Sequence, residues 1–195
     1  MEQRELTREA NRLWAEGLRA LHAGRRDEAA EALREAARTY RASWDAGAPP
    51  DSWGRPIAAM KALLLAGDDA GDAARWALDA GAADSESPIG RYAGALALLV
   101  LGQDVEARVL GSTLRDREDF PQAVADAVVT VAASDRAGYL LAIEDVLESF
   151  EQRTEFLEDV RVADTVLVFQ VLAAARDCAV DLRPSPLLPD PGSPS

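Results

Sequence analysis

The sequence contains very little of the chemistry that catalytic and metal-binding sites usually need. It has one histidine, His22, and one cysteine, Cys178, in 195 residues. One cysteine cannot form an internal disulfide, and one histidine cannot build a histidine metal cluster. No serine or cysteine nucleophile accompanies His22 in a recognisable motif, so a catalytic triad is not predicted. We expect His22 to have a structural role, either in packing or at the end of its helix. We expect Cys178 to be a small buried apolar residue.

Long apolar segments are also missing. The longest run, "AGALALLVLG" at residues 93–102, is about half of the roughly 20 residues that a membrane span needs. The opening "MEQRELTREA" is charged and lacks the apolar core of a signal peptide. We therefore expect a buried helix over the apolar run and a cytoplasmic protein that does not bind membranes.

Positive charge is scarce relative to negative charge. Lysine and arginine number 21 against 34 aspartates and glutamates, which gives a formal net charge of -13. Nucleic acid is not an expected ligand, because neutralising phosphates needs clustered cations. A basic protein partner fits this charge better. Glycine-rich phosphate loops do not occur, and no cofactor is predicted. Lys61 is the only lysine, and we attribute the excess of arginine to genome composition.

What the sequence has in abundance is helical periodicity. Apolar residues recur at spacings of three and four, and glycine or proline falls where helices should end. With 48% apolar residues, the chain can bury one core. We predict a single all-α domain over residues 1–183, built as about four antiparallel helical hairpins plus a C-terminal helix. The predicted helices span 3–22, 27–41, 56–66, 70–82, 88–101, 104–115, 121–133, 136–152 and 162–176.

Proline and glycine mark the hairpins. Pro56, Pro88 and Pro121 each open an apolar helix, where the missing N–H of proline costs nothing. The turns within the hairpins are predicted at Gly24, Gly67, Gly102 and Ser134. These turns lie 43, 35 and 32 residues apart. A spacing in the thirties is typical of stacked helical hairpins, each of which needs its neighbours to bury its apolar face.

The first hairpin, "LWAEGLRALHAGRRDEAAEALREAA" at residues 13–37, resembles a tetratricopeptide repeat. The matching positions are Leu13, Gly17, Gly24, Ala29, Leu33 and Ala36. Glu16, Ala20 and Arg26 depart from the pattern. "RYAGALALLVLGQDVEARVLGSTL" is a weaker repetition, with Gly111 where a bulky residue is expected. The resemblance implies stacked helical hairpins, and it leaves open whether they form an open solenoid or a compact bundle.

The C-terminal third resembles the closing pattern of the immunity protein 49 family. The similarity lies in "AASDRAGYLLAIEDVLESFEQRTEF" and "VADTVLVFQVLAAARDCAVDLRPSPLLP". In that pattern a hairpin with a polar turn precedes an apolar helix, a short polar turn, an extended segment and a Leu-Leu-Pro-like end. Cys178 departs from it, because a helix-ending glycine is more usual there. The resemblance implies a protein that neutralises a bacterial toxin by binding it.

Residues 142–160, "AIEDVLESFEQRTEFLEDV", concentrate negative charge. A continuous helix would place five carboxylates in one stripe, namely Glu144, Glu148, Glu151, Glu155 and Glu158. Like charges at this spacing oppose the helix. The stripe can be an ordinary solvated face, interrupted near Arg153 and Thr154, or a docking strip for a basic partner. Metal binding is disfavoured, because the calcium-loop pattern and a Glu-x-x-His pair are both missing.

Two further segments are distinctive. In "SWDAGAPPDSWGRP" at residues 43–56, Trp44 and Trp53 flank a Pro-Pro turn. These rings either pin the long connection to the core or line a binding face together with Arg55. The segment "PSPLLPDPGSPS" at residues 184–195 is predicted to be a largely disordered proline-rich tail. Its Leu187 and Leu188 can still dock on the domain.

These features together predict a non-catalytic protein-binding module, with toxin neutralisation as the favoured mechanism. A generic scaffold or regulator is one alternative, and a helical enzyme with an unrecognised site is another. The oligomeric state is left open. The candidate partner-binding residues are Glu144, Glu148, Glu151, Glu155, Glu158, Trp53 and Arg55.

Overall fold

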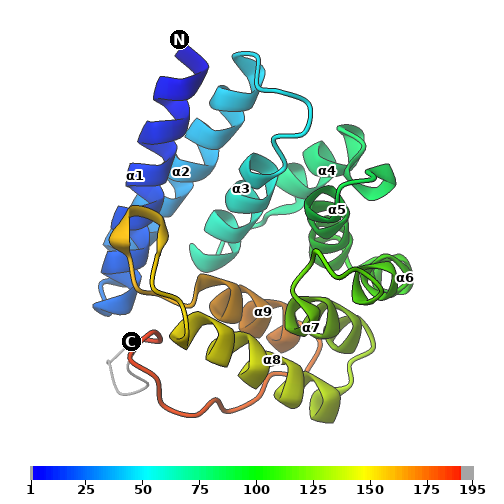
Figure 1. Ribbon diagram of the computed structural model, residues 1–195. Helices are drawn as coiled ribbons and strands as arrows, with labels where there is room; N and C mark the ends of the chain where they lie inside the picture. The colour runs from blue at the N-terminus through cyan, green and yellow to red at the C-terminus, as the bar shows by residue number, and fades with distance from the viewer. Residues whose placement is uncertain (1, 190–195) are drawn as a thin grey trace.

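The computed structural model describes residues 2–189, and within this range the chain forms helices and connections without any β-strand (Figure 1). The α-helices are α1 (Glu2–His22), α2 (Arg26–Asp45), α3 (Gly54–Leu65), α4 (Gly71–Asp79), α5 (Pro88–Val100), α6 (Asp104–Arg115), α7 (Gln122–Ala132), α8 (Arg136–Glu151) and α9 (Asp164–Ala174). Two short 3₁₀ turns, η1 (Ala82–Asp84) and η2 (Leu157–Asp159), lie in the connections. The all-α prediction is confirmed.

All four predicted turn residues adopt the left-handed backbone conformation that ends a helix. Their φ angles are 74° at Gly24, 77° at Gly67, 69° at Gly102 and 51° at Ser134. In each case the next N–H donates to a carbonyl five residues earlier, as in Arg25 N to Ala20 O at 2.9 Å. This is the Schellman arrangement, which satisfies the last carbonyls of a helix. Local sequence alone is therefore sufficient to place these four turns.

A fifth turn of the same kind follows α9. Asp177 has a φ of 55°, and Cys178 N donates to Ala173 O at 3.0 Å. The left-handed residue is thus one position before the cysteine that stands where glycine was expected. Cys178 is buried, with 1% of its surface exposed, and burial raises the pKa of its thiol. Its predicted role as a buried apolar residue agrees with this position.

The C-terminal helix closes the array. Successive helices pack on one another in chain order, and α9 returns to pack against α3, α7 and α8 (Figure 1). The short turn η2 packs on α1. Phe169 of α9 is completely buried. The sequence left open a solenoid or a bundle, and the structure is the compact, closed alternative.

A buried ion pair joins α9 to α3. The Nζ atom of Lys61 lies 2.7 Å from Asp164 Oδ2 and donates to Thr165 Oγ1 at 2.8 Å. The Lys61 and Asp164 side chains are only 11% and 18% exposed. Burial by itself lowers the pKa of Lys61, but the facing carboxylate of Asp164 more than offsets this effect, so the pKa is raised overall. The only lysine of the chain is therefore a structural cation at the closing contact.

Two glycines allow neighbouring helices to approach closely. A Cβ atom at Gly17 of α1 would lie 2.6 Å from Leu33 Cγ of α2. A Cβ atom at Gly111 of α6 would lie 2.6 Å from Val128 Cγ1 of α7. The bulky residue that the repeat pattern wants at position 111 has no room, because Val128 occupies that space.

The proline-rich segment begins on the body of the domain. Leu187 is 2% exposed, and its carbonyl accepts a hydrogen bond from Ala163 N at 2.9 Å. Leu188 is half-buried beside it. The expectation that these leucines dock is confirmed. Residues 190–195, half of the tail predicted to be largely disordered, lie outside the described residues.

Candidate functional site

The predicted stripe of five carboxylates does not form one helix face. Helix α8 ends at Glu151, so only Glu144, Glu148 and Glu151 share it. Glu155 lies in the connection that follows, and Glu158 lies in η2 with a φ of 52°. The interruption falls at Arg153 and Thr154, where the sequence allowed for it. Repulsion between like charges four residues apart opposes a longer helix.

Two carboxylates of α8 hold the C-terminal segment. Arg183 Nε lies 2.8 Å from Glu144 Oε2, and its Nη2 lies 2.7 Å from Glu151 Oε2. Ser185 Oγ donates to Glu151 Oε1 at 2.7 Å. The guanidinium of Arg183 and this hydroxyl lower the pKa of Glu151. Glu144 and Glu151 therefore have intramolecular partners and are poor candidates for contacts with another protein.

Removal of these two charges is expected to loosen the C-terminal segment. In the variant Glu144→Gln/Glu151→Gln, we expect hydrogen exchange at the backbone amides of Arg183, Ser185, Leu187 and Leu188 to accelerate. The melting temperature should fall only slightly, because partly exposed ion pairs each contribute about 0–1 kcal/mol. The matched control is Asp79→Asn/Glu86→Gln, which removes two exposed charges far along the chain. Equal exchange rates in the two variants would contradict the conclusion that Glu144 and Glu151 hold the C-terminal segment on α8.

The remaining charge on α8 lies beside this ion pair on a surface that we call the outer face of α8 and define as Ala137, Leu141, Asp145 and Glu148. At about 100° per residue these positions share one side of the helix. All four are exposed, and Leu141 has 70% of its surface in solvent. Within residues 2–189, no ion pair joins Asp145 or Glu148 to a cation. The outer face of α8 therefore combines an exposed apolar side chain with two uncompensated carboxylates.

The other two carboxylates of the predicted stripe belong to a connection that packs toward α1. Arg19 Nη2 donates to the backbone carbonyl of Glu158 at 2.8 Å. The Arg153 guanidinium lies 3.7 Å from the centroid of the Phe150 ring, a cation–π contact. The side chains of Glu155 and Glu158 are exposed, but they do not line up with the outer face of α8.

Trp53 and Arg55 are placed as anchors of the long connection. Trp53 is 6% exposed, and its ring centroid lies 6.1 Å from that of Trp44. Arg55 Nε donates to Ser43 Oγ at 2.7 Å, and its Nη2 donates to Thr7 Oγ1 at 3.1 Å. Of the two roles left open by the sequence, these contacts match the one that pins the connection to the core.

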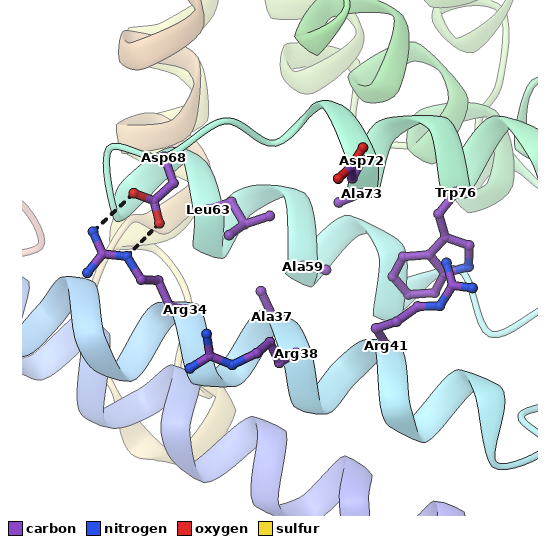
Figure 2. A pocket seen from close by; sticks show the side chains of 10 residues that line it. All are labelled: Arg34, Ala37, Arg38, Arg41, Ala59, Leu63, Asp68, Asp72, Ala73 and Trp76. Atoms are coloured by element: carbon purple, nitrogen blue, oxygen red, sulfur yellow. Dashed lines mark hydrogen bonds and ion pairs between the residues drawn. The ribbon is translucent and has the colours of Figure 1, made fainter.

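An open groove of about 290 Å³ lies between α2 on one side and α3 and α4 on the other (Figure 2). Its floor consists of three alanines, one from each helix, namely Ala37, Ala59 and Ala73. Because these side chains are small, facing helices leave space between them. Leu63 and Trp76 supply the large apolar surfaces of the groove.

Arginines of α2 form one wall of this groove. Arg34, Arg38 and Arg41 recur at spacings of four and three, so they share one side of the helix. Arg34 makes two hydrogen bonds to Asp68, with Nε 2.6 Å from Oδ2 and Nη2 3.0 Å from Oδ1. These bonds lower the pKa of Asp68. This pair spans one end of the groove, as Figure 2 shows.

The opposite end of the groove is bounded by an aromatic contact. The Arg41 guanidinium lies 4.8 Å from the centroid of the Trp76 ring (Figure 2). Arg38 stands between the two ends, and its Nε donates to Glu35 Oε2 at 2.9 Å. The groove thus has an apolar floor, two closed ends and a wall of arginines, and Asp72 of α4, paired with Arg75 at 2.6 Å, also lines it (Figure 2).

Sequence reasoning missed this groove. The spacing of the three arginines on α2 was visible, but arginine at helical spacing on an exposed face is common. Ala59, Ala73 and Trp76 come from α3 and α4, 18 to 42 positions farther along the chain than these arginines. Only the packing of α3 and α4 on α2 brings them together.

The remaining candidates have structural roles. His22, in the last turn of α1, donates from Nε2 to Pro186 O at 3.0 Å, and so helps to hold the C-terminal segment. Among residues 2–189, no group of three or more His, Cys, Asp or Glu side chains is arranged to hold a metal ion. Within the same range, no helix is long and apolar enough to cross a bilayer.

Comparisons with protein-family models, with curated proteins and with solved structures found no match to this chain. The candidate surfaces must therefore be interpreted from their own geometry and charge.

Proposed function

We propose that this chain is a non-catalytic module that binds a basic protein through the outer face of α8. The observation that carries the proposal is the exposure of Leu141 beside Asp145 and Glu148. Leu141 is 70% exposed, and neither carboxylate has an ion-pair partner within the described part of the chain. An exposed apolar side chain beside uncompensated charge suits a docking contact with an oppositely charged partner.

The overall charge supports the same partner class. A net charge of -13 attracts basic proteins and raises their association rate, while it opposes binding to acidic ones. Fewer residues are available to the partner than the predicted docking strip contains, because Glu144 and Glu151 form ion pairs with Arg183 of the same chain. We place the docking contact on Asp145, Glu148 and Leu141.

Toxin neutralisation is the more specific form of this proposal. The likeness of the C-terminal third to the immunity protein 49 pattern supports it, and so does the charge. Nucleases are a common class of toxin and expose basic substrate grooves, which an acidic helix face can cover. In this mechanism the protein acts by stoichiometric occlusion, and no residue of the chain performs chemistry.

Affinity capture from the lysate of the native host tests the proposal. The tagged chain is expected to retain one basic protein at near-equal stoichiometry, identified by mass spectrometry. The complex should persist at low salt and weaken at moderate salt, because exposed charges are screened within about 10 Å at 0.1 M ionic strength. If the tagged chain retains only acidic proteins, or no protein, the proposal of a basic partner is contradicted. A toxin gene next to the gene for this chain would support the specific form.

A further inference from the structure

We propose that the groove between α2 and α3–α4 is a second binding site, which takes a short amphipathic helix of a partner protein. Apolar side chains of that helix would rest on the alanine floor, and its carboxylates would face Arg38 and Arg41. This site is separate from the outer face of α8, and its argument does not depend on the basic partner proposed there.

The size and lining of the groove indicate that it binds side chains of a partner protein rather than a whole small molecule. Its volume of about 290 Å³ lies at the lower limit for small-molecule pockets, which start near 300 Å³. The floor offers the methyl groups of Ala37, Ala59 and Ala73, and the Trp76 ring forms one apolar wall (Figure 2). Such a surface accepts one or two large apolar side chains of a partner.

A helical ligand fits this lining better than an extended one. The backbone N–H and C=O groups of α2, α3 and α4 are used within their own helices, so the groove offers an extended peptide few backbone partners. A helix satisfies its own backbone groups and presents only side chains. The wall from Arg34 to Arg41 rises roughly 10.5 Å along α2, which is about two turns of a ligand helix.

The charge expected of the ligand follows from the arginines that can leave their present ion pairs and bind the ligand instead. Arg38 and Glu35 form an exposed pair three residues apart, with side chains 68% and 51% exposed. Such pairs contribute about 0–1 kcal/mol, so Arg38 can turn to a ligand carboxylate at little cost. Arg41 pairs with Asp45 in a similarly exposed way. Arg34 is different, because its two bonds to Asp68 close the end of the groove.

The acidic surface elsewhere does not prevent this contact. Exposed charges more than about 8–10 Å away are largely screened at physiological salt. The two carboxylates that line the groove have cations of their own, since Asp68 pairs with Arg34 and Asp72 pairs with Arg75. Arg38 and Arg41 are therefore the groups that set the charge of the ligand. Glutamates at spacings of three or four on the ligand helix would match Arg38 and Arg41, which are three positions apart.

The test uses two synthetic 14-residue helical peptides with leucines along one face. One carries glutamates beside the leucines, and the other carries lysines in the same places. We expect the glutamate peptide to bind the full chain and to shift the methyl NMR signals of Ala37, Ala59 and Ala73. Arg38→Glu should weaken its binding at least tenfold and should favour the lysine peptide.

A matched control keeps the test decisive. Arg25→Glu removes the same kind of exposed pair, since Arg25 and Glu28 are three residues apart with side chains 55% and 64% exposed. This variant and Asp145→Asn/Glu148→Gln should bind the glutamate peptide as the wild type does. The proposal is overturned if the wild type does not bind that peptide at millimolar concentration. Equal weakening by Arg38→Glu and Arg25→Glu, or preference of the wild type for the lysine peptide, would overturn it too.

Discussion

Replacing Asp164 by alanine is expected to lower the free energy of unfolding by about 3–5 kcal/mol. The substitution leaves the ammonium group of Lys61 buried without its countercharge, and Lys61 is only 11% exposed at the contact of α3 with α9. Thr165 alone would still accept a hydrogen bond from Lys61. Urea denaturation at pH 7 measures the loss.

The double variant Lys61→Met/Asp164→Leu is the control for this prediction. It removes both charges, and exchanging a buried ion pair for apolar residues of similar volume is often neutral or stabilising. We expect it to recover most of the stability that Asp164→Ala loses. If the double variant is as unstable as the single one, the loss comes from packing and the ion-pair explanation fails.

The same pair predicts a pH dependence. The pKa of Lys61 is raised in the folded chain, despite burial, by the facing Asp164. A raised pKa means that the folded state binds more protons, so stability falls as pH rises. The contribution of the pair is fully present below the ordinary lysine pKa of about 10.4 and is lost as pH passes through the folded value. The double variant should lack this part of the alkaline loss.

Replacing Phe169 by alanine is the second prediction with a large effect. Phe169 lies in the middle of α9 and has no exposed surface. Truncating a buried phenylalanine removes its burial and leaves a cavity, which costs about 3–5 kcal/mol. At ~2–4 °C per kcal/mol for a domain of this size, the melting temperature should fall by roughly 6–20 °C.

Val171→Ala provides the control within the same helix. Val171 is 39% exposed, so its truncation should change the free energy of unfolding by about 0.5 kcal/mol or less. Similar small effects for both variants would show that α9 is not at the centre of the core. The closed arrangement of the helices would then be wrong.

The features that the sequence predicted correctly depend on local interactions. The turns at Gly24, Gly67, Gly102 and Ser134 are set by a left-handed residue and by carbonyls less than two helical turns away. Helix boundaries were less exact. For example, α4 was predicted to reach residue 82 and ends at Asp79. Gly81, with a φ of 87°, turns the chain there, and 82–84 form η1 instead.

What the sequence could not predict depends on residues far apart in the chain. Glu144 and Glu151 looked like free surface charge, because their partner Arg183 follows 39 and 32 positions later. The partner of Lys61 could not be predicted either, because Asp164 lies far along the chain and only the packing of α9 on α3 brings it beside Lys61. A single lysine inside an apolar helix was nevertheless a usable signal, since a charge in such a place requires a partner.

The most direct test of the central claim is the association rate of the captured partner with Asp145→Asn/Glu148→Gln, compared with the control Asp79→Asn/Glu86→Gln. Both variants remove two exposed negative charges from the chain, so any effect of net charge alone is the same for both. We predict that the outer-face variant binds several-fold more slowly than the control at low salt, and that the difference shrinks as salt is added. Equal association rates for the two variants would contradict the assignment of the outer face of α8 as the docking surface.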